Sequence, residues 1–199
     1  MTERLLVPTR ERLLRAAQEL IEQDGYGAAS VLAIADRAGV AGGTLYRHFP
    51  SKEELFVELF RTVCDREVQA MREAAASMPA EAGHAERLET VLATLAQRAL
   101  RRPRLAWALI AEPVDPLVDA ERLAYRARYA ALIAGELRDG IADGQLPAQD
   151  AELVAAALVG GCGEALVGPL APLSGALPQP DAVIAGLRSF VRRAIGAPV

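Results

Sequence analysis

The chain is poor in cysteine and lysine and carries no excess of basic residues. Its 199 residues include two cysteines, Cys64 and Cys162, so we expect neither a disulfide framework nor a cysteine-based zinc site. The formal net charge of -4, from 22 basic and 26 acidic side chains, argues against a broad basic coat for polyanions. Any contact with nucleic acid must therefore be local.

Signals for export or membrane insertion are also weak. The first residues have no long apolar core of the signal-peptide kind, which favours a cytoplasmic location. Residues 153–173 approach the length of a spanning helix, but Glu164 interrupts them, Pro169 and Pro172 break their end, and no basic residue lies within ten positions on either side. We therefore predict no membrane contact and read this run as a buried helix of a bundle.

Hydrophobic periodicity predicts an all-α protein. Apolar residues recur at three and four positions, and no stretch keeps the two-residue alternation of a strand. Thr9 is expected to cap the first helix, and Ser51 with Glu54 forms a capping box at the start of a long one. The predicted helices cover residues 9–24, 30–39, 44–49, 51–76, 84–101, 103–111, 117–139, 149–168 and 180–195.

Residues 30–49 have the pattern of a helix-turn-helix. Ser30 can cap the first short helix, Ala35 is small where the helices cross, and Gly39 allows the tight turn. Leu45 and Phe49 are expected to point into the core. The outward face then presents donors for base edges, a methyl group for thymine and groups for phosphates, carried by Gly42, Gly43, Thr44, Tyr46, Arg47 and His48.

The string from Ile34 to Leu55, IADRAGVAGGTLYRHFPSKEEL, resembles the DNA-binding signature of the tetracycline-repressor (TetR) family of bacterial transcription regulators. The resemblance covers about residues 9–60. It implies that Gly43, Thr44 and Arg47 lie against bases, and that Tyr46, His48 and Lys52 bind phosphates. It also implies a homodimer, formed largely through the last two long helices, which binds a palindromic operator in double-stranded DNA.

Two positions depart from the family pattern. The family often has threonine at the position of Val31 and a polar or basic residue at that of Leu32. Two apolar residues make a base contact from this helix doubtful. The recognition task then falls to Arg47 and to an amino-terminal arm, with Arg4 and Arg10 as further DNA-binding residues, since residues 1–60 hold seven basic and nine acidic side chains and steering must come from placement.

The rest of the chain carries no recognised ligand motif. Trp107, Tyr125 and Tyr129 either line an effector cavity or are plain core packing. Glu164 is a lone carboxylate in an apolar run, costly to bury unless it binds a polar effector or pairs with an arginine such as Arg126 or Arg128.

We therefore predict a three-helix DNA-binding head at residues 1–50 and a helical effector-binding and dimerisation body at residues 51–199. The expected function is a repressor released from its operator by a small molecule, with an activator of the same family as a variant. The alternatives are an all-α enzyme or a protein-interaction module. An enzyme is disfavoured, because no phosphate loop, metal-ligand spacing or serine elbow occurs, and we expect no catalytic residues, metal or cofactor.

Overall fold

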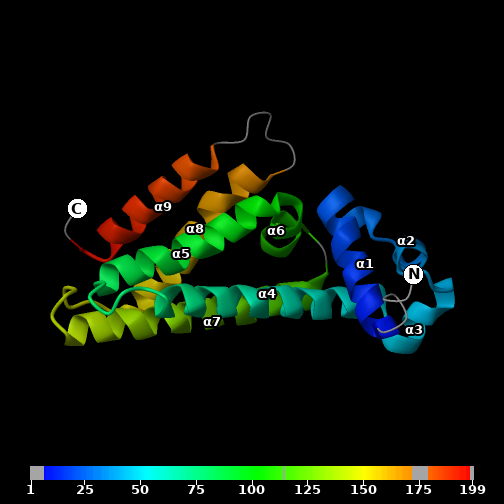
Figure 1. The fold of residues 1–199 in the computed structure, drawn as a ribbon, viewed down its shortest axis with the longest axis horizontal. Helices are drawn as coiled ribbons and strands as arrows, with labels where there is room; N and C mark the ends of the chain where they lie inside the picture. The colour runs from blue at the N-terminus through cyan, green and yellow to red at the C-terminus, as the bar shows by residue number, and fades with distance from the viewer. Residues whose placement is uncertain (1–6, 114, 172–178, 198–199) are drawn as a thin grey trace. The chain divides into compact units, whose positions relative to one another are not determined.

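The computed structural model describes residues 7–113, 115–171 and 179–197, and within these ranges the chain forms helices and turns without strands. The prediction of an all-α fold is confirmed (Figure 1). The α-helices are α1 (Thr9–Asp24), α2 (Val31–Ala38), α3 (Leu45–His48), α4 (Lys52–Ala76), α5 (His84–Arg101), α6 (Pro103–Ile110), α7 (Pro116–Ala142), α8 (Ala151–Leu170) and α9 (Pro180–Ala194). Two short 3₁₀ helices, η2 (Tyr26–Ala28) and η3 (Gly42–Thr44), precede α2 and α3.

Most predicted boundaries are met to within a few residues, and two expectations are wrong. Pro8, with φ of -54°, occupies the position before α1, so Thr9 is the first helical residue and not the cap. Gly140, expected to break α7, is helical. A Cβ atom there would lie 2.8 Å from Cβ of His84 and from Cδ1 of Leu146, so the glycine is retained for close packing.

The first compact unit, unit 1, comprises Met1–Val63 and Arg102–Arg122. In it α1 packs against α2, α6 and η2. Its core contains large side chains with less than 2% exposure, among them Leu13, Ile21, Ile34, Leu45 and Phe56. The helix-turn-helix therefore has a hydrophobic core of its own, to which α6 contributes from far along the chain.

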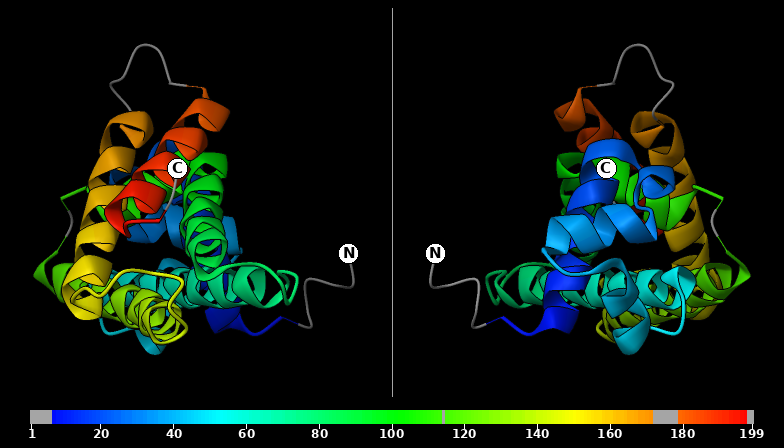
Figure 2. Two further views of the ribbon diagram at one scale, coloured as in Figure 1. Left: turned by 90° about the vertical axis from the view of Figure 1, so that its left-hand side faces the viewer. Right: turned by 90° about the vertical axis from the view of Figure 1, so that its right-hand side faces the viewer.

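The second compact unit, unit 2, comprises Cys64–Arg101 and Leu123–Val199. Here α5 packs against α8 and α9, and α8 packs against α9, as two side views also show (Figure 2). Met71, Leu88, Leu92 and Ile133 are among its fully buried side chains. These units describe packing. The functional division into residues 1–50 and 51–199 stays a prediction.

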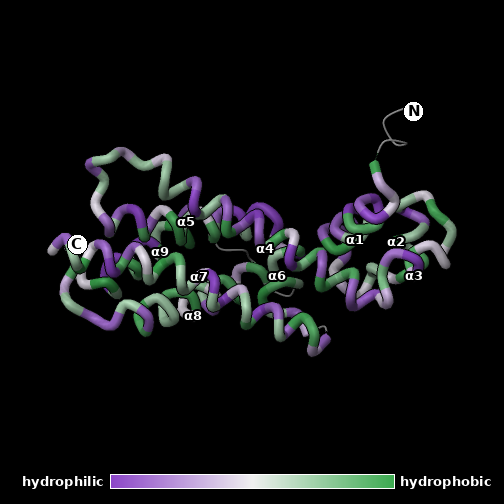
Figure 3. Tube along the Cα trace, turned by 90° about the horizontal axis from the view of Figure 1, so that it is seen from below, coloured by the Kyte–Doolittle hydropathy of each residue, from purple (hydrophilic) through white to green (hydrophobic). Residues whose placement is uncertain are grey.

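Helix α8 is long and apolar enough to cross a membrane by length and composition, the one helix in the described part of the chain that meets this test. Hydrophobic residues follow each other along most of its trace (Figure 3). Only 28% of its most apolar 18-residue window is buried within the chain. The expectation of a buried helix is therefore only partly correct: one side packs on α5 and α9, and much of the rest is open.

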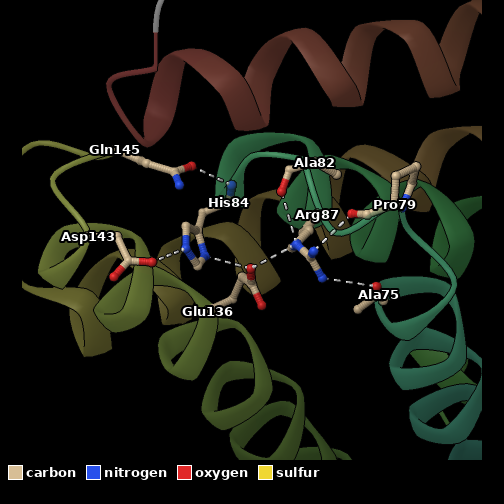
Figure 4. A network of polar contacts seen from close by, with 8 residues as sticks. All are labelled: Ala75, Pro79, Ala82, His84, Arg87, Glu136, Asp143 and Gln145. Carbon is tan, nitrogen blue, oxygen red and sulfur yellow. Dashed lines mark hydrogen bonds and ion pairs between the residues drawn. The ribbon is translucent and has the colours of Figure 1, made fainter.

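A polar network fastens the loop before α5 to α7 within unit 2 (Figure 4). His84 Nδ1 lies 2.8 Å from Oε1 of Glu136, and His84 Nε2 lies 3.0 Å from Oδ2 of Asp143. Gln145 Oε1 accepts the backbone N–H of His84 at 3.1 Å. Arg87 donates to the carbonyl oxygens of Ala75, Pro79 and Ala82 and lies 4.0 Å from Glu136.

Candidate nucleic-acid interface

Helix α3 sorts its side chains between core and solvent. Leu45 is fully buried and Phe49 is 2% exposed, so both anchor the helix to the core of unit 1 as the pattern predicts. Tyr46 is 59% exposed, and Arg47 and His48 are exposed beside it. A short helix held from below thus leaves its hydrogen-bonding side chains free for a ligand.

The turn between α2 and α3 is fixed at both ends of α2. Ser30 Oγ accepts the N–H of Ala33 at 3.2 Å, so the predicted N-cap is confirmed. Gly39 is left-handed, with φ of +67°, and its N–H bonds to Asp36 O while the N–H of Val40 bonds to Ala35 O, both at 2.9 Å. This pattern ends the helix sharply, and the glycine is needed because a side chain would be strained there.

Arg12 reinforces the same turn from α1. Its Nη2 atom donates to the carbonyl oxygens of Ala38 and Gly39, the second at 3.2 Å. The last carbonyl groups of a helix have no partner within the helix, so the guanidinium supplies the missing donors at the end of α2. The sequence gave no sign of this role, because the residues joined are 26 and 27 positions apart.

Helix α4 begins as the capping box predicts. Ser51 Oγ accepts the N–H of Glu54 at 3.2 Å. Tyr26 of η2 lies against this first turn, with its ring centroid 4.5 Å from that of Phe56. The start of α4 is therefore packed into unit 1 next to the recognition helix.

Two predicted phosphate-binding residues have partners inside unit 1. Lys52 Nζ lies 4.1 Å from the ring centroid of Tyr26 and 3.5 Å from its carbonyl oxygen, and burial lowers the pKa of this lysine. Arg10 pairs with Glu58 through both guanidinium ends and lies 4.8 Å from the ring centroid of Phe49. Each cation thus has a structural role, and its contact with phosphate stays a prediction. Arg4 lies outside the described residues.

The four residues expected at an effector site divide between the units. Trp107 is half-buried on α6 in unit 1. Tyr125 and Tyr129 come together on α7 in unit 2, with ring centroids 6.3 Å apart. Glu164 is exposed on α8, so the expectation of a costly buried carboxylate is wrong, and Arg128, one of its suggested partners, pairs instead with Asp65 at 2.7 Å.

A polar cluster around Tyr125 and Tyr129 was not foreseen. The hydroxyl of Tyr125 donates to Asp65 Oδ1 at 2.8 Å, and Arg128 lies over the Tyr125 ring at 4.5 Å. Burial, followed by the charge of Cys64 and a hydrogen bond to it, raises the pKa of Tyr129, while burial raises the pKa of the Cys64 thiol to about 12. Cys64 is therefore a neutral, buried thiol rather than a reactive one. The spacing of residues 125, 128 and 129 on one helical face was the available signal.

Within the described residues, no group of three His, Cys, Asp or Glu side chains is arranged to hold a metal ion. His84, raised in the sequence as a distant partner for His48, binds its own carboxylates, Glu136 and Asp143. The chemistry of the candidate interface is therefore that of exposed hydrogen-bond donors on α3.

An all-helical chain with a capped helix-turn-helix and a donor-rich recognition helix defines the class of helix-turn-helix regulatory proteins. Known proteins agree. The family model of bacterial regulatory proteins, tetR family, matches residues 13–59. The HTH-type transcriptional repressor KstR2 of Rhodococcus jostii is 33% identical over 139 residues, which cover 68% of this chain and 66% of that protein. The chain belongs to the TetR family.

The likeness is strongest in the first third of the chain. The HTH-type transcriptional regulator UidR of Escherichia coli K12 is 39% identical over 66 residues, so the match spans 33% of this chain and only 34% of that relative. The whole length is matched in fold. A crystal structure of the transcriptional regulator FadR from Bacillus subtilis in complex with stearoyl-CoA has a TM-score of 0.77 at 22% identity, covering 95% of this chain and 99% of the other.

Proposed function

We propose that this chain is a DNA-binding transcriptional repressor that leaves its operator when a small molecule binds its body. The observation that carries the proposal is α3, where Leu45 and Phe49 are buried and Tyr46, Arg47 and His48 are exposed together. Gly43, exposed at the start of this segment, leaves room for close approach to a base edge. Thr44 is half-buried beside it.

A homodimer is the second part of the proposal. Leu153 on α8 is 67% exposed and Phe190 on α9 is 41% exposed, although α8 and α9 pack on each other. The ring of Phe190 lies 3.0 Å from where a Cβ atom of Gly161 would stand, so small residues let the two helices form one apolar face. A second copy is the natural cover, since two recognition helices on a two-fold axis match a palindromic operator.

Effector control is the third part. The chain leaves unit 2 after Arg101, enters unit 1 as α6 and returns after Arg122. Within unit 1, Arg102 lies 3.3 Å from Glu22, and Arg104 donates to the carbonyl oxygen of Gln23 at the end of α1. A ligand that displaces α4 or α6 would therefore move α1 and α3, and binding of effector and of DNA would oppose each other by linkage.

The proposal places the protein in the cytoplasm, where DNA is accessible, and assigns it no catalysis, metal or cofactor. The packing of α8 on α5 and α9 supports a folded bundle rather than a membrane span. An all-α enzyme or a protein-interaction module remain the rival readings. Both predict that double-stranded DNA does not bind with a sequence preference.

The DNA-binding test is a fluorescence-anisotropy titration of a site selected from random double-stranded DNA, at several salt concentrations. We expect Arg47→Ala to cost about 1–3 kcal/mol per half-site and to relax the sequence preference, because a base contact carries specificity. Tyr46→Phe should weaken binding to all sequences alike, because a phosphate contact only positions. The control is Arg138→Ala on α7, which removes an exposed arginine paired with Glu152. Equal affinity of Arg47→Ala and parent would rule out the role of α3.

The effector class that we test first is a fatty acyl-CoA, because FadR of similar fold binds stearoyl-CoA. A ligand at a hundred times its dissociation constant stabilises a protein by about 2.7 kcal/mol, which a thermal-shift experiment detects. We expect stearoyl-CoA to raise the melting temperature and to release operator DNA. Free coenzyme A and free stearate are the controls. If none of the three changes either measurement, this effector class is excluded while the DNA-binding proposal stands.

A further inference from the structure

Leu32, in the first turn of α2, is 75% exposed, more than any other large hydrophobic side chain in the described part of the chain. A single exposed leucine needs no explanation by itself. Its position supplies one. The Cδ2 atom of Leu32 lies 3.3 Å from where a Cβ atom of Gly42 would stand, so the leucine rests on the first residue of η3, which leads directly into α3.

The contact with Gly42 puts an apolar group beside the donor-rich surface of the recognition helix. Gly43 is exposed next to Gly42 and has open space around it, so the backbone there can approach a flat ligand closely. Residues on either side of Leu32 leave it free: Ser30 is used as the cap of α2 and Asp36 lies one turn further along in solvent. The side chain therefore extends the surface of α3 instead of filling the core.

We infer that Leu32 reads the 5-methyl group of a thymine in the major groove, and this inference rests on the proposed DNA binding. The major groove presents one apolar group, the thymine methyl, and polar atoms at every other base edge. A leucine pressed on a polar edge would take water from it and return no hydrogen bond, whereas a methyl group is buried with gain. The apolar residue that made a base contact from α2 doubtful thus becomes a contact of a different chemical kind.

The experiment removes only the methyl group. Each thymine of the selected operator is replaced by deoxyuridine, symmetrically in both half-sites, and the affinity of each DNA is measured for the parent, Leu32→Ala and Leu123→Ala. Leu123 is the matched control, because it is 67% exposed on α7 in unit 2. Thermal melts and the salt dependence of binding accompany the titrations, and neither should change in Leu32→Ala, since the side chain is exposed and uncharged.

At one thymine per half-site we expect deoxyuridine to weaken binding of the parent about tenfold over the two half-sites, because burying one methyl group is worth roughly a factor of three to four. Leu32→Ala should bind the thymine and deoxyuridine forms equally, and Leu123→Ala should behave as the parent. If no replacement weakens the parent, or if Leu32→Ala keeps the full penalty, the inference is wrong while the DNA binding stands. A parent protein that prefers no DNA sequence would overturn the proposed function and the inference together.

Discussion

At the scale of single residues, the histidine of unit 2 shows how neighbours set a charge. Burial alone would lower the pKa of His84, but hydrogen bonds to Asp143 and Glu136, and the charges of both carboxylates, outweigh it and raise the pKa above its usual value. Arg87, 4.0 Å from Glu136, is the cation that faces the same cluster. The protonated imidazole therefore links the loop before α5 to two positions on α7.

This network predicts a pH-dependent contribution to stability. Because the pKa of His84 is higher in the folded state than in the unfolded state, its contribution is complete below the unfolded value, about 6.5, and is lost as the pH rises through the folded value. We expect His84→Asn to lower the melting temperature more at about pH 6 than at about pH 8.5. The control is His48→Asn on the exposed face of α3. A difference that stays constant, or grows, with rising pH would contradict the sign of the shift.

At the scale of elements, arginine side chains complete the carboxyl ends of helices in three places. Arg12 serves α2, Arg87 binds carbonyl oxygens at and after the end of α4, and Arg122 donates to the carbonyl oxygens of Ala108, Leu109 and Glu112 around the end of α6. A guanidinium carries five donors in a rigid fork and so can satisfy several such carbonyls at once. With Lys52 as its single lysine, the chain relies on arginine for this task.

The cap at α2 predicts a separation between stability and charge. Arg12→Ala removes two hydrogen bonds from a charged donor, and we expect the free energy of unfolding of the head to fall by about 1.5–3 kcal/mol, measured by urea denaturation. Operator affinity should also fall, because the turn before α3 loosens, but the slope of log affinity against log salt should stay unchanged. A phosphate contact would instead lower that slope by about 0.9.

Arg15→Ala on the same helix is the control for the Arg12 variant. Arg15 is exposed and pairs with Glu11 four positions earlier at 3.3 Å, so its loss should cost no more than about 0.5 kcal/mol. A reduced salt slope in Arg12→Ala would show that this guanidinium contacts DNA, and equal stability of the two variants would show that it does not support the turn.

At the scale of the whole molecule, the open apolar face of α8 and α9 predicts the oligomeric state. We expect Phe190→Glu and Leu153→Glu to give monomers by light scattering, because a carboxylate buried between two copies would be unpaired. A monomer carries one recognition helix, so operator affinity should fall steeply. Leu123→Glu, an equally exposed position on α7, should leave the dimer intact. Dimers of normal affinity in both α8 and α9 variants would refute this interface.

Prediction from the sequence succeeded where the signal was local. Ser30, Gly39 and Ser51 act at the helix ends to which they were assigned, because capping depends on residues within three or four positions. It failed where the deciding neighbour was remote. Gly140 continues α7 because His84 packs on it, and Glu164 is exposed because α8 presents that side outward.

The sequence by itself determined the helical class, the order of the helices and the family, because periodicity, caps and a twenty-residue motif are read along the chain. Tertiary structure alone decided which cations are occupied, which apolar side chains remain open and which helix joins which unit. Arg10 is held by Glu58, Leu32 rests on Gly42, and α6 belongs with α1, all through contacts between residues far apart in the chain. Net charge could not reveal them, because an average over residues contains no positions.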